Sequence, residues 1–199
     1  MESYDAARNL YSNGRNSLRR DGNGLSSLDD ISIMVEEEQT HDSVIMSVLN
    51  RVSPFKGMDS MMLAGLVVDG LKMMVSLHAA PALLEDAVSL CKANSAFLGR
   101  SKVDEGAALL IGSLESSRRG GSSPPQGVLL YALAKSMCIK FGTCAPSGDA
   151  IFNEKLITLL QDTSNSIGVD TTCDSTREHV DGIKKMLLIP VIQGMFASI

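Results

Sequence analysis

The chain has 199 residues and a formal net charge of −5, with 44% hydrophobic and 21% charged residues. This length supports one sizeable core or two small domains. The acidic balance excludes a protein that coats nucleic acid with its whole surface, although it leaves room for a local basic face. Only 4% of the residues are aromatic, whereas 11 are methionine. We therefore expect an adaptable core of aliphatic and methionine side chains.

The N-terminal residues 1–20 are polar and lack the apolar segment of a secretory signal. The most apolar stretch, residues 61–84, does not predict a membrane span, because residues that are costly in hydrocarbon interrupt it. These residues are Asp69, Lys72, His78 and Pro81. The sequence therefore predicts an intracellular protein without a transmembrane segment.

The four cysteines show no CxxC pair and no spacing typical of a disulfide framework: Cys91, Cys138, Cys144 and Cys173. In an intracellular protein we expect them to be reduced thiols that pack as small hydrophobic residues. The alternatives are a disulfide between Cys138 and Cys144, or a redox role.

The first elements are weakly defined. Residues 1–25 contain several turn-forming Asn-Gly and Asp-Gly pairs and predict a mobile arm or a frayed helix. A short helix follows Ser26 or Ser27, and Thr40 or Asp42 begins another helix that ends before Pro54.

Residues 59–97 predict a buried helical hairpin, because apolar residues recur at helical spacing from Leu63 to Val75 and the remaining faces are largely apolar as well. Pro81 suits the first position of the second helix, since its missing N–H would be unpaired there. We expect Gly99 to end that helix. Ser101 and Asp104 have the spacing of a capping box at the start of the next one.

Residues 118–127, RRGGSSPPQG, form the clearest break in the pattern and predict either a domain linker or an exposed loop between helices. Beyond it, one apolar stripe ends at Gly142 and a second helix ends before Gly168. Ser175 and Glu178 resemble another capping box, and Pro190 is expected to kink the last helix.

No stretch alternates with the period of a strand, so the fold class is all-α, a multi-helix bundle of about eight or nine helices in two packed helical subdomains. The expected organisation is an arm at 1–25, an N-terminal helical domain at 26–117, the linker or loop at 118–127, and a C-terminal helical domain at 128–199.

The sequence contains no recognisable catalytic, cofactor-binding or metal-binding motif. The three histidines, His41, His78 and His179, have no cysteine or carboxylate at metal-ligand spacing. Phosphate loops, nucleophile elbows and kinase motifs are absent as well. The sequence therefore favours a non-enzymatic protein without a small-molecule substrate.

The basic residues are candidates for binding anionic lipid or a protein partner, at about 1 kcal/mol for each Lys or Arg near an anionic membrane. The alternative is a solubilising surface. Aromatic side chains that could stack on bases are nearly absent around them, which disfavours single-stranded RNA. The candidates are Arg8, Arg15, Arg19, Arg20, Arg100, Lys102, Arg118, Arg119, Lys184 and Lys185.

Three segments in the second half follow one another in a suggestive order: GVLLYALAKSMCIKFG, FNEKLITLLQDTSNS and STREHVDGIKKM. In order and spacing they resemble the middle domain of orthomyxovirus matrix proteins, where a helix rich in Ala, Leu and Met precedes a glycine turn, an apolar helix and a polar His-bearing segment. The earlier segment VSPFKGMDSMMLAGLVVDGL resembles that family's proline-containing turn and buried apolar helix.

The resemblance implies a helical viral matrix protein of the virion that self-associates beneath the inner face of a membrane and contacts anionic lipid and ribonucleoprotein. The family's basic run has no counterpart, since the comparable residues 103–108 read VDEGAA. No nucleic-acid or nuclear-import site is carried over. The alternative function is a soluble intracellular adaptor or chaperone that holds a partner helix in a methionine-lined groove.

Overall fold

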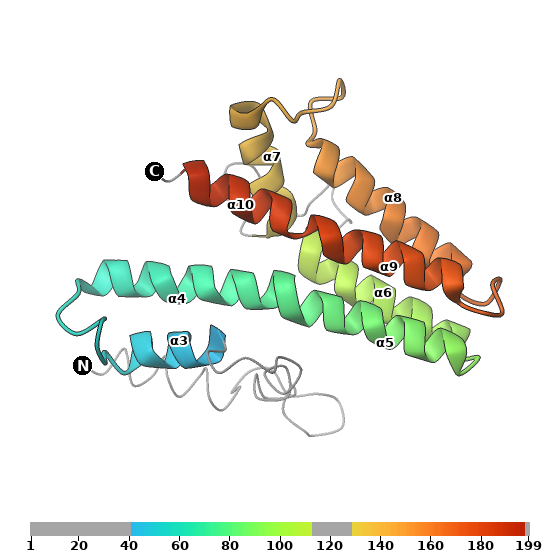
Figure 1. The fold of residues 1–199 in the computed structure, drawn as a ribbon, viewed down its shortest axis with the longest axis horizontal. Helices are drawn as coiled ribbons and strands as arrows, with labels where there is room; N and C mark the ends of the chain where they lie inside the picture. The colour runs from blue at the N-terminus through green and yellow to red at the C-terminus, as the bar shows by residue number, and fades with distance from the viewer. Residues whose placement is uncertain (1–40, 113–128, 198–199) are drawn as a thin grey trace. The chain divides into compact units, whose positions relative to one another are not determined.

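The computed structural model describes residues 41–112 and 129–197, which are almost entirely helical (Figure 1). The elements in chain order are α3 (His41–Leu49), α4 (Ser60–Met74), the π-helix η1 (Val75–Ala79), α5 (Ala80–Lys92), α6 (Ala96–Ile111), α7 (Leu130–Phe141), α8 (Ile151–Ser166), α9 (Asp174–Met186) and α10 (Leu188–Ala197). Within these ranges the only β-type pairing is an isolated bridge between Cys144 and Ala150. The predicted all-α class is confirmed for this part of the chain, while the total number of helices and the two packed subdomains stay predictions.

The chain divides into two compact units, residues 1–74 and 75–199. The second unit places α5 and α6 together with α7 to α10, whereas the sequence assigned residues 26–117 to one domain and 128–199 to another. The predicted arm at 1–25 and the linker or loop at 118–127 lie outside the described residues.

The first unit contains α3 and α4, which pack through a small apolar core. Ile45, Leu49 and Met74 are buried, and Met46, Val67 and Leu71 pack partly buried against them. At Gly70 an added Cβ would lie 3.1 Å from Ile45 Cγ1, so this glycine lets α3 approach α4 closely.

The expected hairpin between residues 59 and 97 is wrong, because helical structure runs without interruption from Ser60 to Lys92. Pro81 lies in the first turn of α5, as predicted, yet no loop precedes it. The five residues of η1 lie immediately before α5, where the wider hydrogen-bond spacing of a π-helix accommodates the missing proline N–H.

The turn occurs instead at residues 93–95, where Asn94 has a positive φ of 55°. Gly99, expected to end a helix, lies inside α6 and is buried. An added Cβ there would lie 3.3 Å from the Ala87 carbonyl oxygen of α5 and 3.3 Å from Ile167. Gly99 therefore permits close packing rather than helix termination, and the predicted capping box at Ser101 and Asp104 is wrong because both residues lie within the helix.

In the second unit α5 packs along α6, α8 along α9, and α7 against α10, with further contacts from α5 to α9 (Figure 1). The core is aliphatic. Its fully buried residues include Leu84, Val88, Val103, Leu110, Ile111, Leu156, Ile167, Val180, Ile183 and Leu187.

The other predicted boundaries hold with one exception. Gly142 ends α7 with a φ of 64°, and α8 ends before Gly168. Pro190 has no N–H for the Met186 carbonyl, and the last helix breaks between α9 and α10 accordingly. Ser175 is already within α9, so the capping box that the sequence predicts there does not form; the cap comes from another residue.

Candidate functional site

All four cysteines are paired in disulfides, so the expectation of reduced thiols is wrong. Cys138 and Cys144, the pair considered as an alternative, join the last turn of α7 to the loop that follows it. Cys91 pairs with Cys173 across a sequence separation of 82 residues, with the two Cα atoms 6.1 Å apart. The second bond was missed because nothing in a single sequence shows that the end of α5 meets the α8–α9 turn.

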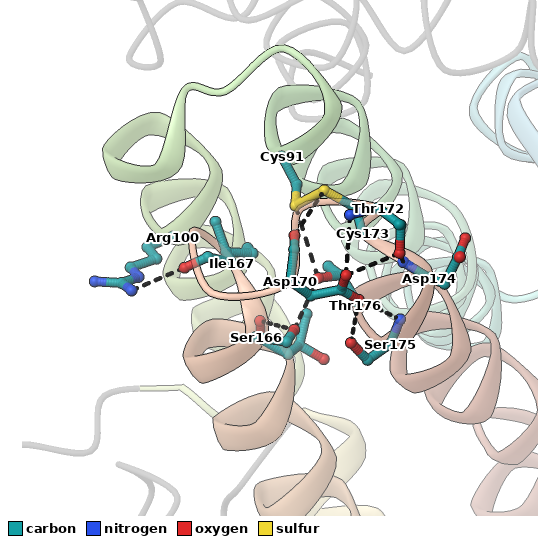
Figure 2. Close-up of a disulfide and its surroundings, with 11 residues drawn as sticks. Cys91, Arg100, Ser166, Ile167, Asp170, Thr172, Cys173, Asp174, Ser175 and Thr176 are labelled. Carbon is teal, nitrogen blue, oxygen red and sulfur yellow. Dashed lines mark hydrogen bonds between the residues drawn. A yellow bond between two sulfur atoms is a disulfide. The ribbon is translucent and has the colours of Figure 1, made fainter.

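The Cys91–Cys173 bond joins the last turn of α5 to the residue before α9 (Figure 2). Cys91 is 5% exposed and Cys173 is 1% exposed. Cys173 has a φ of 61°, the left-handed region that is unusual for a residue other than glycine. The surroundings must therefore hold this turn in place.

Asp170 supplies much of that support as the cap of α9. Its Oδ1 accepts hydrogen bonds from Thr172 N at 3.0 Å and Thr172 Oγ1 at 2.8 Å. Its Oδ2 accepts from Ser175 N at 2.9 Å and from Ser175 Oγ (Figure 2). The Ser175 side-chain and backbone bonds, followed by those from Thr172, hold the pKa of Asp170 well below its usual value.

A second support comes from Arg100, which the sequence offered as a lipid-binding residue. Its Nη2 donates to the Ile167 carbonyl at 2.8 Å and its Nε to the Ser164 carbonyl at 3.2 Å. These carbonyls lie at the C-terminal end of α8, where a cation is favourable. Arg100 therefore ties α6 to α8 instead of pointing freely at a membrane.

A chain of hydroxyl groups connects the disulfide to α8 (Figure 2). Thr176 Oγ1 lies 3.8 Å from Cys91 Sγ and 2.8 Å from Ser166 Oγ. Ser166 Oγ in turn donates to the Thr163 carbonyl at 2.9 Å. On the other side of the bond, Cys173 Sγ lies 3.6 Å from the Asp170 carbonyl oxygen.

The four basic candidates that the structure describes lie on two helices, with Arg100 and Lys102 on α6 and Lys184 and Lys185 on α9. Lys102 pairs with Glu105 at 2.6 Å, and Lys184 pairs with Glu85 at 2.8 Å. Lys185 is exposed and forms no ion pair within residues 41–112 and 129–197. The other candidates, Arg8, Arg15, Arg19, Arg20, Arg118 and Arg119, lie outside the described residues.

Glu85 on α5 receives both Lys184 and Arg177 from α9. Partial burial raises the pKa of Glu85, but the hydrogen bonds and positive charges of Lys184 and Arg177 outweigh it and lower the pKa overall. The ion pairs of Glu85 with Arg177 and Lys184 join α5 to α9, so Lys184 contributes to the packing of these two helices.

Large apolar side chains are exposed on both units. On α4 they are Met61, which is 83% exposed, with Met62, Leu66 and Val68; we call these four residues the α4 surface. In the second unit Phe97 is 84% and Val169 is 76% exposed, with Leu98 beside Phe97 in the chain; we call these three the tip surface. The start of α6, which bears Phe97 and Leu98, lies beside the turn after α8, which bears Val169, since a Cβ at Gly168 would lie 3.0 Å from Ala96 Cβ.

The helical stretch Ser60–Lys92 has the length and apolar composition of a membrane-crossing helix, and only 19% of its most apolar window is buried. Among the described residues no group of three or more His, Cys, Asp and Glu side chains is placed to hold a metal ion.

No known family model, no curated protein and no solved structure matches the chain.

Proposed function

We propose that the chain is a non-enzymatic, matrix-like structural protein that self-associates on the inner face of a membrane. The observation that carries this proposal is the α4 surface, four large apolar side chains exposed on one helix. Soluble proteins that act alone seldom leave contiguous apolar surface in water, and such surface is typical of sites that meet a membrane or another protein. The resemblance to orthomyxovirus matrix proteins supports the same function.

Lipid suits the α4 surface because the sequence from Ser60 to Val68 contains no charged residue. Asp69 and Lys72 follow within the same helix and would be costly at the centre of a bilayer. We therefore propose that α4 lies in the interface plane and does not cross the membrane. Each Met, Leu or Val side chain transferred from water to lipid contributes about 1.5–3 kcal/mol when fully buried.

The apolar side chains are proposed to supply more of the binding than charge does. Arg100, Lys102 and Lys184 already have partners within the chain. Exposed ion pairs are weak and rearrange easily, but they reduce the positive field that a lipid headgroup would meet. Binding should therefore persist when salt screens the remaining charges.

Flotation with vesicles tests the proposal. The wild-type chain should rise with vesicles that contain anionic lipid, at low and at high salt, and the double variant Met61→Glu with Val68→Glu should remain at the bottom. The matched control is Phe97→Glu with Val169→Glu, which places the same number of charges on the tip surface and should still float.

The tip surface is proposed to serve contact between copies. Light scattering at increasing concentration should show assemblies for the wild-type chain. The double variant Phe97→Glu with Val169→Glu, which served as the control in flotation, should stay monomeric. A wild-type chain that neither floats nor assembles would overturn the proposal and would favour the alternative function, a soluble adaptor for a partner helix.

A further inference from the structure

Each sulfur of the Cys91–Cys173 bond lies near an oxygen atom that could accept a hydrogen bond from a thiol. A disulfide sulfur has no proton to donate, whereas a thiol has one. Cys173 Sγ faces the Asp170 carbonyl oxygen at 3.6 Å, and Cys91 Sγ faces Thr176 Oγ1 at 3.8 Å. Both distances suit an S–H donor.

A count of hydroxyl protons shows that the contact at Cys91 is not satisfied in the oxidised state. Ser166 uses its one proton on the Thr163 carbonyl, so the proton between Ser166 and Thr176 comes from Thr176. Carbonyl and hydroxyl oxygens are better acceptors than sulfur, which favours this direction along the chain. Thr176 then offers Cys91 only oxygen lone pairs.

We propose that Cys91 and Cys173 form a reversible redox lock, a site built to hold both the dithiol and the disulfide. In the dithiol state Cys91 S–H donates to Thr176 Oγ1 and Cys173 S–H donates to the Asp170 carbonyl. In the disulfide state the same backbone is joined covalently, and the turn before α9 is fixed to α5.

The oxidant proposed is a low-molecular-weight disulfide such as glutathione disulfide. The thiolate of one cysteine attacks a sulfur of that disulfide and releases one small thiol, which leaves a mixed disulfide on the protein. The second cysteine then attacks the protein-bound sulfur and releases the other small thiol. Two electrons and two protons pass from the cysteine pair to the small-molecule disulfide.

The Cys138–Cys144 pair differs and serves as an internal comparison. Within the part of the chain that the structure describes, neither of its sulfur atoms makes a contact with an oxygen like those at Cys91 and Cys173. Backbone hydrogen bonds stabilise this loop: Thr143 N donates to the Cys138 carbonyl at 2.9 Å and Ile151 N donates to the Thr143 carbonyl at 3.0 Å. Its dithiol state gains nothing comparable from the surroundings.

The test is a redox titration of the full chain in glutathione buffers, with Cys138 and Cys144 replaced by serine so that one bond titrates. Free thiols are trapped by alkylation and counted by mass spectrometry. Thr176→Val removes the acceptor for Cys91 S–H while keeping the side-chain shape. Because only the dithiol state loses a hydrogen bond to Cys91, the equilibrium should move toward the disulfide by roughly two- to fivefold.

Thr163→Val is the matched control, since Thr163 is equally buried on the neighbouring helix and its hydroxyl bonds only the Leu159 carbonyl, at 2.6 Å. This variant should leave the redox equilibrium unchanged. Equal titrations for the two variants would overturn the proposal, as would cysteines that stay reduced at every glutathione ratio.

Circular dichroism of the fully reduced wild-type chain provides a measurement that needs no variant. A reversible lock requires a folded dithiol state, so the reduced chain should keep its helical spectrum and unfold cooperatively. A reduced chain without helical structure would show that the bond is a requirement for folding and would overturn the proposal. None of these measurements needs a membrane or an assembled protein.

Discussion

At the scale of single residues, the side chain of Asp170 stabilises both the turn that bears Cys173 and the start of α9. Its carboxylate accepts four hydrogen bonds, of which the one from Ser175 N caps α9 and the two from Thr172 hold the turn before it, next to Cys173 in its left-handed conformation. A serine or threonine directly at the N-cap is the usual solution. Here Cys173 occupies that position and cannot cap, so a carboxylate from the preceding turn takes the role.

The lowered pKa of Asp170 gives its contribution a defined pH range. In the unfolded chain an aspartate has a pKa of about 3.9. Since the folded pKa is lower, the contribution is fully present above the unfolded value and is lost as the pH falls through the folded pKa.

Asp170→Ala should therefore lower the urea midpoint at pH 7 and narrow the difference between the midpoints at pH 7 and pH 3. Asp162→Ala, an exposed aspartate on α8, is the control and should behave like the wild type. An Asp170→Ala chain with the full wild-type pH dependence would contradict the capping role.

Two helical glycines should respond in opposite ways to a larger side chain. Gly99→Val forces a branched side chain against the Ala87 carbonyl and Ile167, and overpacking of this kind costs about 1–3 kcal/mol. Gly65 on α4 faces open space, so Gly65→Ala should stabilise the helix by about 0.5–1 kcal/mol. Chemical denaturation measures both changes, and a stabilised Gly99→Val would show that α5 and α6 are not in close contact there.

At the scale of elements, the two disulfides restrict the unfolded chain to different extents. Cys91–Cys173 closes a loop with a sequence separation of 82, and Cys138–Cys144 one of only 6. The chain-entropy estimate gives stabilisations of about 4–5 and about 2 kcal/mol respectively. The difference follows from loop length alone.

Replacing Cys91 and Cys173 by serine should therefore lower the free energy of unfolding more than replacing Cys138 and Cys144. Urea denaturation of the oxidised proteins measures the two losses, with the wild type in reductant as a reference. Equal losses would mean that native packing around each bond, and not the closed loop, sets its contribution.

At the scale of the whole molecule, some helix boundaries could be predicted from the sequence and others could not. Apolar periodicity located α7 and α8 well, because glycines at 142 and 168 end clear stripes. Proline and glycine were misleading at two other positions, where the sequence predicted a helix break before Pro81 and a helix end at Gly99. A proline is tolerated in a helix when a π-turn precedes it, and a glycine inside a helix can serve packing, so neither residue marks an end by itself.

The site was less accessible to sequence reasoning than the fold. Partners far apart in the chain are invisible to periodicity, which concealed both the Cys91–Cys173 bond and the link from Arg100 to α8. The cluster of Asp, Thr and Ser between Asp170 and Ser175 was the available signal, since such residues bond to nearby backbone N–H groups. It indicated a turn but not the cysteine pair held within it.

The long disulfide also changes what a cut in the backbone can do. The Cys91–Cys173 bond closes a covalent ring that includes Arg118 and Arg119. Trypsin-like proteases cleave the peptide bonds that follow arginine residues. A nick there opens the ring without dividing the oxidised molecule, because its two pieces remain joined through sulfur. Only in a reducing environment would the same nick leave two chains without a covalent link, held together only by noncovalent packing such as that of α5 and α6 against α8 and α9.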